Sequence, residues 1–99
     1  MSLPERGAWL RGVMAGRWAD VEPALSRWRD SVVAALLALG EPTVVFTHYV
    51  AINVAVGRAL GDDRVVVFAP DHWSVTVLEI ASGALRLVER GAEAETQVR

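Results

Sequence analysis

The residues best suited to chemistry in this chain are its two histidines, His48 and His72. An imidazole changes charge near neutral pH, so it can exchange a proton or donate a hydrogen bond to a phosphoryl oxygen. His48 follows the β-branched and aromatic run 43–47 (Thr-Val-Val-Phe-Thr) and directly precedes the apolar run 49–60. This order predicts a strand that leads straight into a helix, with His48 at the junction.

A strand-to-helix junction of this kind suits an anion. Side chains at the carboxyl end of a parallel strand face the crevice in which open α/β sheets bind ligands. The first turn of the next helix adds unpaired backbone N–H groups and a partial positive charge. His48 is therefore the main candidate for a site. A purely structural role, in which its ring bonds a neighbouring carbonyl group, fits the spacing equally well.

Three segments give the chain a resemblance to a known family. They are the amphipathic segment 20–39, the run 44–48 that ends in His48, and the segment 70–79 with the sequence Pro-Asp-His-Trp-Ser-Val-Thr-Val-Leu-Glu. With them, the chain from about Arg6 to Glu89 resembles the C-terminal half of a histidine phosphatase of the phosphoglycerate mutase-like superfamily. In that family a histidine at the end of such a strand binds the transferred phosphoryl group beside the nucleophile.

The resemblance implies a role for each residue near the junction. His48 matches the family's second histidine, which makes it the expected catalytic and phosphate-binding residue, with Tyr49 beside it at the phosphate. Thr47, Asn53 and His72 are expected at the rim of the pocket. From spacing alone, Asn53 forms an interhelical hydrogen bond just as readily, and His72 lies in a loop that packing alone would explain. The implied ligand is a small molecule that carries a phosphate.

The departures from the family are as informative as the matches. No Arg-His-Gly motif, which holds the family's nucleophile, occurs here, and the half with the family's second phosphate-binding arginine and acid-bearing loop is missing. Tyr49 replaces a frequent glycine and His72 a common asparagine. The resemblance thus implies a truncated or degenerate homologue. Completed by an N-terminal half, it would hydrolyse a phosphate monoester through a phosphohistidine, without a metal or other cofactor.

Composition supports an alternative of another class. Hydrophobic residues make up 53% of the 99 residues, which is high for a small domain with a polar surface, so part of the apolar surface is expected to lie against a partner. The alternative is a non-catalytic oligomeric interaction module that uses an open sheet edge and the tryptophans at 9, 18 and 28. The net charge of −2 gives no basic surface for nucleic acid or an anionic membrane.

Other classes of site and location are disfavoured by the residue content. The chain has no cysteine, which excludes disulfides, thiolate catalysis and cysteine metal sites. The adjacent carboxylates Asp62 and Asp63 have no third ligand nearby in sequence, so we expect a solvated turn instead of a metal site. The start of the chain does not resemble a signal peptide and no apolar run reaches the length of a membrane span, so a cytoplasmic location is expected.

The periodicity of the chain predicts the elements that would position the junction. The expected elements are a helix over 2–15 begun by a capping box, a helix over 20–39 capped by Asp20, a strand over 43–47, a helix over 49–60, strands over 64–68 and 74–80, and a strand over 85–89 that closes a hairpin.

These elements predict an α/β fold. The resemblance refines it to a partial three-layer phosphoglycerate mutase-like fold, a mixed sheet of about four strands with a C-terminal hairpin and packed helices. Residues 1–90 are expected to form one truncated domain and 91–99 a polar tail. In the family, the strand matching 43–47 lies in mid-sheet beside the strand that carries the nucleophile. The edge left open here is expected to be covered by a second copy, giving a homodimer, or by a complementing N-terminal half.

Overall fold

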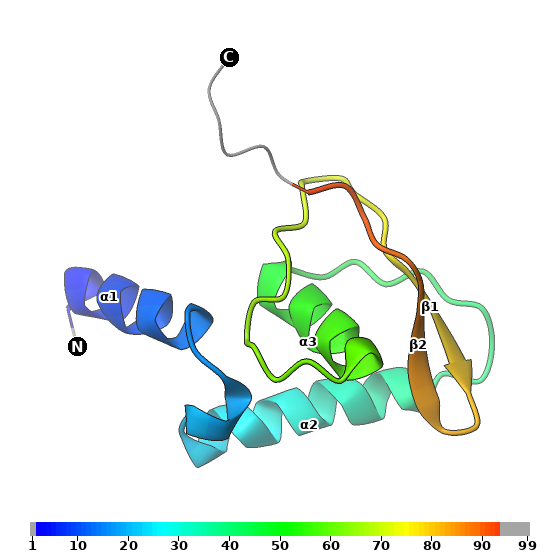
Figure 1. The fold of residues 1–99 in the computed structure, drawn as a ribbon, viewed down its shortest axis with the longest axis horizontal. Coiled ribbons are helices and arrows are strands. Elements are labelled where there is room, and N and C mark those ends of the chain that lie inside the picture. Colours follow the sequence, from blue (N-terminus) through cyan, green and yellow to red (C-terminus); the bar gives the residue numbers. More distant parts are fainter. Residues whose placement is uncertain (1, 94–99) are drawn as a thin grey trace.

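Three helices and one hairpin make up the fold. The structure, a computed structural model, describes residues 2–93. Its elements are α1 (Leu3–Met14), a 3₁₀ turn (Trp18–Asp20), α2 (Pro23–Leu37), α3 (Tyr49–Leu60), β1 (Val77–Ala81) and β2 (Ala84–Glu89). The hairpin packs against α3 through β2, and α2 packs along α3 (Figure 1). None of the helices in the described part of the chain is long and apolar enough to cross a membrane.

The first helix begins as its sequence predicts. The Ser2 hydroxyl accepts a hydrogen bond from the Glu5 N–H at 3.2 Å and donates to the Glu5 carboxylate at 2.9 Å, so the predicted N-cap at Ser2 is confirmed, although the carboxylate binds the hydroxyl instead of the backbone N–H of a complete capping box. Of the twelve described residues of α1, none is buried. In Figure 1, α1 lies on one side of the molecule and the hairpin on the other.

The second helix starts later than predicted, and the assignment of Asp20 as its N-cap is wrong. Asp20 ends the 3₁₀ turn, and Glu22 occupies the N-cap position of α2 (φ −59°, ψ 147°) without a side-chain capping bond. Pro23 explains the shift, because proline is favoured at the first helical position and drives the residue before it out of the helical region.

The third helix is the centre of the fold. It follows His48 directly, as predicted, and is buried along most of its length at Ala51 and residues 53–57. Gly61 ends it in the left-handed conformation (φ 67°) that suits glycine. The core is formed by Trp18, Val33, Val54, Val65 and Leu85, which come from the 3₁₀ turn, α2, α3, the segment after α3 and β2.

The predicted strand at 43–47 is not a strand in the structure. Residues 42–48 form the extended connection from α2 to α3, and the described contacts include no hydrogen bond from the backbone groups of Val44 to Phe46. All five residues of the run are exposed. A β-prone run becomes a strand only when a second strand forms backbone hydrogen bonds with it, and no segment within the described residues does so here.

The predicted strand at 64–68 is also wrong, for a different reason. The backbone N–H groups of Val67 and Phe68 donate to the side chain of Asn53, and the Val65 N–H donates to the Gly16 carbonyl at 3.0 Å. Within the described residues, the β-type pairing of the segment 64–68 is limited to an isolated antiparallel bridge between Arg17 and Arg64. The described residues therefore hold one two-stranded sheet and not the predicted sheet of about four strands.

The C-terminal hairpin is confirmed, with β1 beginning at Val77 instead of Ser74. Ser82 and Gly83 both have positive φ (54° and 74°), the signature of a type I′ turn that matches strand twist. Beyond β2, Gly91 is buried and donates to the Thr76 hydroxyl at 2.9 Å, so the segment predicted as a tail starts against the hairpin. The remainder of that predicted tail, 94–99, lies outside the described residues.

Candidate functional site

His48 lies where the sequence places it, at the entrance to α3. Its backbone is extended (φ −121°, ψ 172°), and its Nδ1 accepts a hydrogen bond from the Ala51 N–H at 3.4 Å. His48 is therefore the N-cap of the helix. Because Nδ1 acts as the acceptor, the proton of the neutral ring belongs on Nε2, which can donate to a ligand.

An aromatic row connects this cap to the core. The imidazole of His48 is stacked on the indole of Trp28, with ring centroids 6.1 Å apart and planes 9° apart. Trp28 in turn lies 6.5 Å from Trp18, tilted by 35°. Since Trp18 is buried and His48 is exposed, the row runs from the core to the surface and fixes one face of the imidazole against Trp28.

Asn53, which was expected at a pocket rim, is a buried residue whose side chain bonds to the backbone of its own chain. Its side-chain oxygen accepts from the N–H groups of Val67 and Phe68 at 2.6 and 3.0 Å, and its amide donates to the Tyr49 carbonyl at 3.0 Å. Asn53 is fully buried, so these bonds replace water for all of the groups involved. Its role is to attach the segment after α3 to the helix.

Of the other predicted site residues, only Tyr49 takes part in these contacts, through its carbonyl group. Thr47 is exposed in the connection before the cap, and Tyr49 is the half-buried first residue of α3. His72 is exposed in the loop before β1, where its N–H donates to the Asp71 carboxylate at 2.8 Å. Among the described hydrogen bonds, none joins His48 to His72. The structure thus assembles Tyr49 and His48 at one helix end without linking His72 to them.

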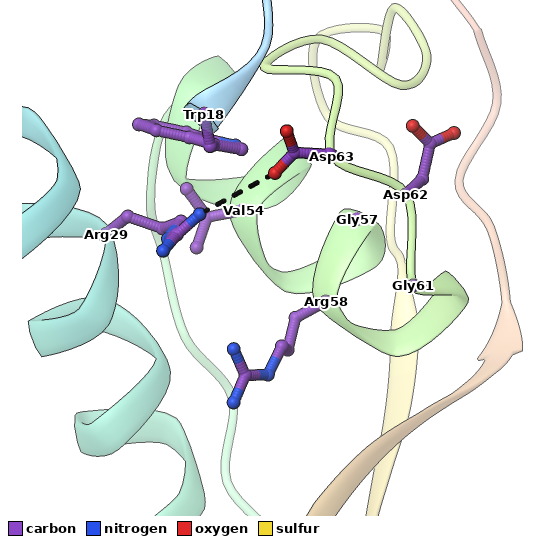
Figure 2. A pocket seen from close by; sticks show the side chains of 8 residues that line it. All are labelled: Trp18, Arg29, Val54, Gly57, Arg58, Gly61, Asp62 and Asp63. Carbon is purple, nitrogen blue, oxygen red and sulfur yellow. Dashed lines mark ion pairs between the residues drawn. The ribbon is translucent and has the colours of Figure 1, made fainter. Parts of the chain in front are cut away.

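A pocket of about 180 Å³ opens beside Trp18, between α2, α3 and the loop after α3 (Figure 2). Its lining residues are Trp18, Arg29, Val54, Gly57, Arg58, Gly61, Asp62 and Asp63. Residues that are far apart in the chain form this pocket, so no spacing within the sequence predicts it.

Arg29 and Asp63 are the central charges of this pocket. The Arg29 guanidinium lies 5.4 Å from the centre of the Trp18 ring and 4.0 Å from the Asp63 carboxylate, as Figure 2 shows. Asp63 also accepts from the Ala19 N–H at 3.1 Å through its side chain and from the Trp18 N–H at 2.9 Å through its backbone. These contacts fasten the turn before α2 to the loop after α3.

The pocket is lined by two arginines, Arg29 and Arg58, and by the carboxylates of Asp62 and Asp63. Asp62 is paired with Arg64 and Asp63 with Arg29. The lining offers no serine, threonine, histidine or cysteine as a nucleophile. Within residues 2–93, no group of three or more acidic or histidine side chains could hold a metal ion. The adjacent carboxylates of Asp62 and Asp63 bind backbone N–H groups and arginines.

Arg64 holds the carboxyl group of Asp62 in its charged form. The guanidinium of Arg64 donates to both Asp62 oxygens at 2.7–3.1 Å, and its backbone N–H adds a bond of 3.0 Å. These bonds lower the pKa of Asp62 from 3.8 to about 2. Because the pKa is lower in the folded chain, Asp62 stabilises the fold above about pH 4, and this contribution is lost as the pH falls through about 2.

We expect the substitution Asp62→Asn to flatten the acid limb of the stability profile. The free energy of unfolding of the wild type should fall more steeply than that of Asp62→Asn between about pH 4 and pH 2. Urea melts at a series of pH values measure this difference. The Asp62–Arg64 pair is exposed, so about 1 M salt should shrink the difference between the two proteins. Equal slopes of the unfolding free energy against pH at low salt would contradict the lowered pKa of Asp62.

Comparisons with known proteins give no family for this chain. No family model matches it, and neither a curated protein nor a solved structure shows significant similarity to it. The functional assignment therefore depends on the geometry of the chain itself.

Proposed function

We propose that this chain is a protein interaction module that assembles through segments whose strand partners are supplied by another molecule. The supporting observation is the exposure of large apolar side chains where the described residues form no sheet: Val44 is 79% exposed, Phe46 92% and Trp73 98%. A buried aromatic side chain removes about 150–250 Å² from water. Phe46 and Trp73 together thus leave roughly 300–500 Å² of aromatic side chain in contact with water.

The proposal also accounts for the β-prone runs that remain unpaired. The run 43–47 carries the composition of a strand and has free backbone groups in its middle, so a partner strand would complete its ladder. A larger mixed sheet, such as the phosphoglycerate mutase-like sheet of about four strands, would then exist only in the assembled state. The same surface has no acid, base and nucleophile in contact, so the chain alone is expected to lack catalytic turnover.

Light scattering during size-exclusion chromatography tests the module. The chain has a mass of 10.7 kDa, and we expect a dimer or larger oligomer at concentrations of tens of micromolar that dissociates on dilution. Double substitution of Phe46 and Trp73 by serine should shift the protein toward the monomer. Because both side chains are exposed, the fold should survive this change. A monomer at every concentration in the wild type would overturn self-assembly.

A second candidate is supported by His48. An exposed histidine at the N-terminus of α3, with Nε2 free to donate, is the arrangement expected if the chain is the phosphate-facing half of a histidine phosphatase. A complementing N-terminal half would then supply the nucleophile and the second arginine, and the completed enzyme would hydrolyse a phosphate monoester through a phosphohistidine.

Titration calorimetry with inorganic phosphate and vanadate tests this second candidate. His48→Asn keeps a strong N-cap and so leaves the helix intact, but it removes the imidazole donor. We expect about tenfold weaker binding in His48→Asn, corresponding to one lost hydrogen bond to a charged group. Ser31→Ala, on the exposed surface of α2, is the control and should bind as the wild type does. Absence of binding in the wild type would contradict the phosphate site.

A further inference from the structure

We propose that two copies of this chain pair antiparallel through residues 43–47, with the two-fold axis beside Val45. The inference rests on the proposed function and names its partner, a second copy of the same segment. In this register Thr43 of each copy lies opposite Thr47 of the other, Val44 lies opposite Phe46, and Val45 lies opposite itself.

The run is close to a palindrome in chemical type, which is what a two-fold antiparallel pair requires. The order is hydroxyl, apolar, apolar, apolar, hydroxyl, so reversal of the run leaves its pattern unchanged. The cross-strand neighbours would be two threonine pairs, two valine–phenylalanine pairs and one valine pair. Threonine pairs and pairs of an aromatic with a β-branched residue each stabilise a sheet by about 0.2–1 kcal/mol relative to alanine pairs.

The backbone of the run is available for such a ladder. Within the described residues, the N–H and C=O groups of Val44, Val45 and Phe46 take part in no hydrogen bond, while their side chains are exposed. No charged residue lies within 43–47, so the two copies meet without like-charge repulsion across the axis. Native chains commonly protect such an edge with lysine, proline or a covering element, and the interior of this run has none of these residues.

Both ends of the ladder are defined by the chain. Pro42 precedes the run and lacks an N–H, so pairing cannot extend regularly beyond Thr43. At the other end, His48 turns the backbone into α3, where its ring caps the helix. In the proposed register Pro42 lies opposite His48 of the second copy, so the two residues that end the ladder face each other. The ladder is therefore five residues long, a common strand length.

Cysteine crosslinking tests the register, because the chain has no cysteine of its own. Directly opposed residues of antiparallel strands have Cα atoms about 4.5–5.5 Å apart, within the range a disulfide needs. We expect Val45→Cys to form a disulfide-linked dimer rapidly under mild oxidation. Thr43→Cys alone should not form this disulfide, because position 43 of one copy lies four residues along the ladder from position 43 of the other, at about 13 Å. An equal mixture of Thr43→Cys and Thr47→Cys should crosslink where neither variant does alone.

The control is Val75→Cys, another exposed valine outside the run, which should crosslink only by slow collision. If Val75→Cys crosslinks as fast as Val45→Cys, or if the mixture behaves like its components, the register is overturned. A chain that is oligomeric by light scattering but shows no specific crosslink at Val45 would retain the interaction module and reject this interface. A monomer would reject both.

Opposite charges at the axis give an independent readout that needs no oxidation. Val45→Glu and Val45→Arg each place like charges opposite each other, so each variant alone should dimerise at least tenfold more weakly than the wild type. Mixing the two should restore association, because each glutamate then faces an arginine. Wild-type association in either single variant would contradict the proposed axis.

Discussion

Trp18→Ala is expected to lower the free energy of unfolding by about 3–5 kcal/mol, the usual cost of removing a buried aromatic side chain. Trp18 is 6% exposed and belongs to the core cluster with Val33, Val54 and Val65. Its removal also leaves the Arg29 guanidinium without the ring that lies 5.4 Å from it. Since a domain of this length has a total stability of about 5–15 kcal/mol, the loss takes a large share of it.

Urea denaturation followed by circular dichroism measures this loss. The matched control is Trp73→Ala, the same substitution at a side chain that is 98% exposed, and at a dilution where the protein is monomeric we expect a change within about 0.5 kcal/mol there. Trp18→Phe keeps an aromatic ring in the core, so it should fall between the two and remain measurable if the alanine variant does not fold. Equal effects at positions 18 and 73 would contradict the placement of Trp18 in the core.

The helices could be predicted because their signals are local. Ser2 and Glu5 form a cap within one turn, and Gly61 ends α3 through its own backbone conformation. Asp20 was wrongly predicted as the N-cap of α2 because two local signals conflict there. One is a good capping residue at position 20, and the other is a proline three positions later. Pro23 determined the outcome, because its ring restricts Glu22 whatever the side chain at position 20 can offer.

The strands were predicted less well because a strand depends on a neighbour that local sequence does not show. The hairpin was correct since its two strands are joined by the Ser82-Gly83 turn. The runs 43–47 and 64–68 have the right residues but not the partners. In the segment 64–68, the side chain of Asn53 accepts hydrogen bonds from N–H groups that would otherwise donate to a neighbouring strand.

The candidate site could likewise be predicted only where it depends on residues adjacent in the sequence. The position of His48 at the entrance to α3 follows from adjacent residues and could be predicted. Its stacking on Trp28 and the meeting of Arg29 with Asp63 join different elements, so no spacing within one segment indicates them. Asp62 and Asp63 were expected to lie in a solvated turn. The turn is there, but Asp62 is paired with Arg64 just after it and Asp63 with Arg29 of α2.

Asn53→Leu is expected to cost about 2–6 kcal/mol, because it leaves two backbone N–H groups without an acceptor. Each unsatisfied buried group costs about 1–3 kcal/mol, and the groups concerned are those of Val67 and Phe68. Leucine is a better helix former than asparagine, which returns only about 0.5 kcal/mol. Within the described residues no buried side-chain polar atom lacks a partner, so the wild type has no comparable defect.

Hydrogen exchange at the Val67 and Phe68 amides separates this mechanism from a general loss of stability. In the wild type both amides are held by a buried oxygen, so they should exchange slowly. In Asn53→Leu they should exchange much faster than the amides in the middle of α3, because the segment 64–68 detaches before the helix unfolds. Ser31→Ala removes an exposed hydroxyl that donates to the Arg27 carbonyl, and it should change the stability by less than about 0.5 kcal/mol. Unchanged protection at both amides in Asn53→Leu would mean that Asn53 does not anchor this segment, whatever the melt shows.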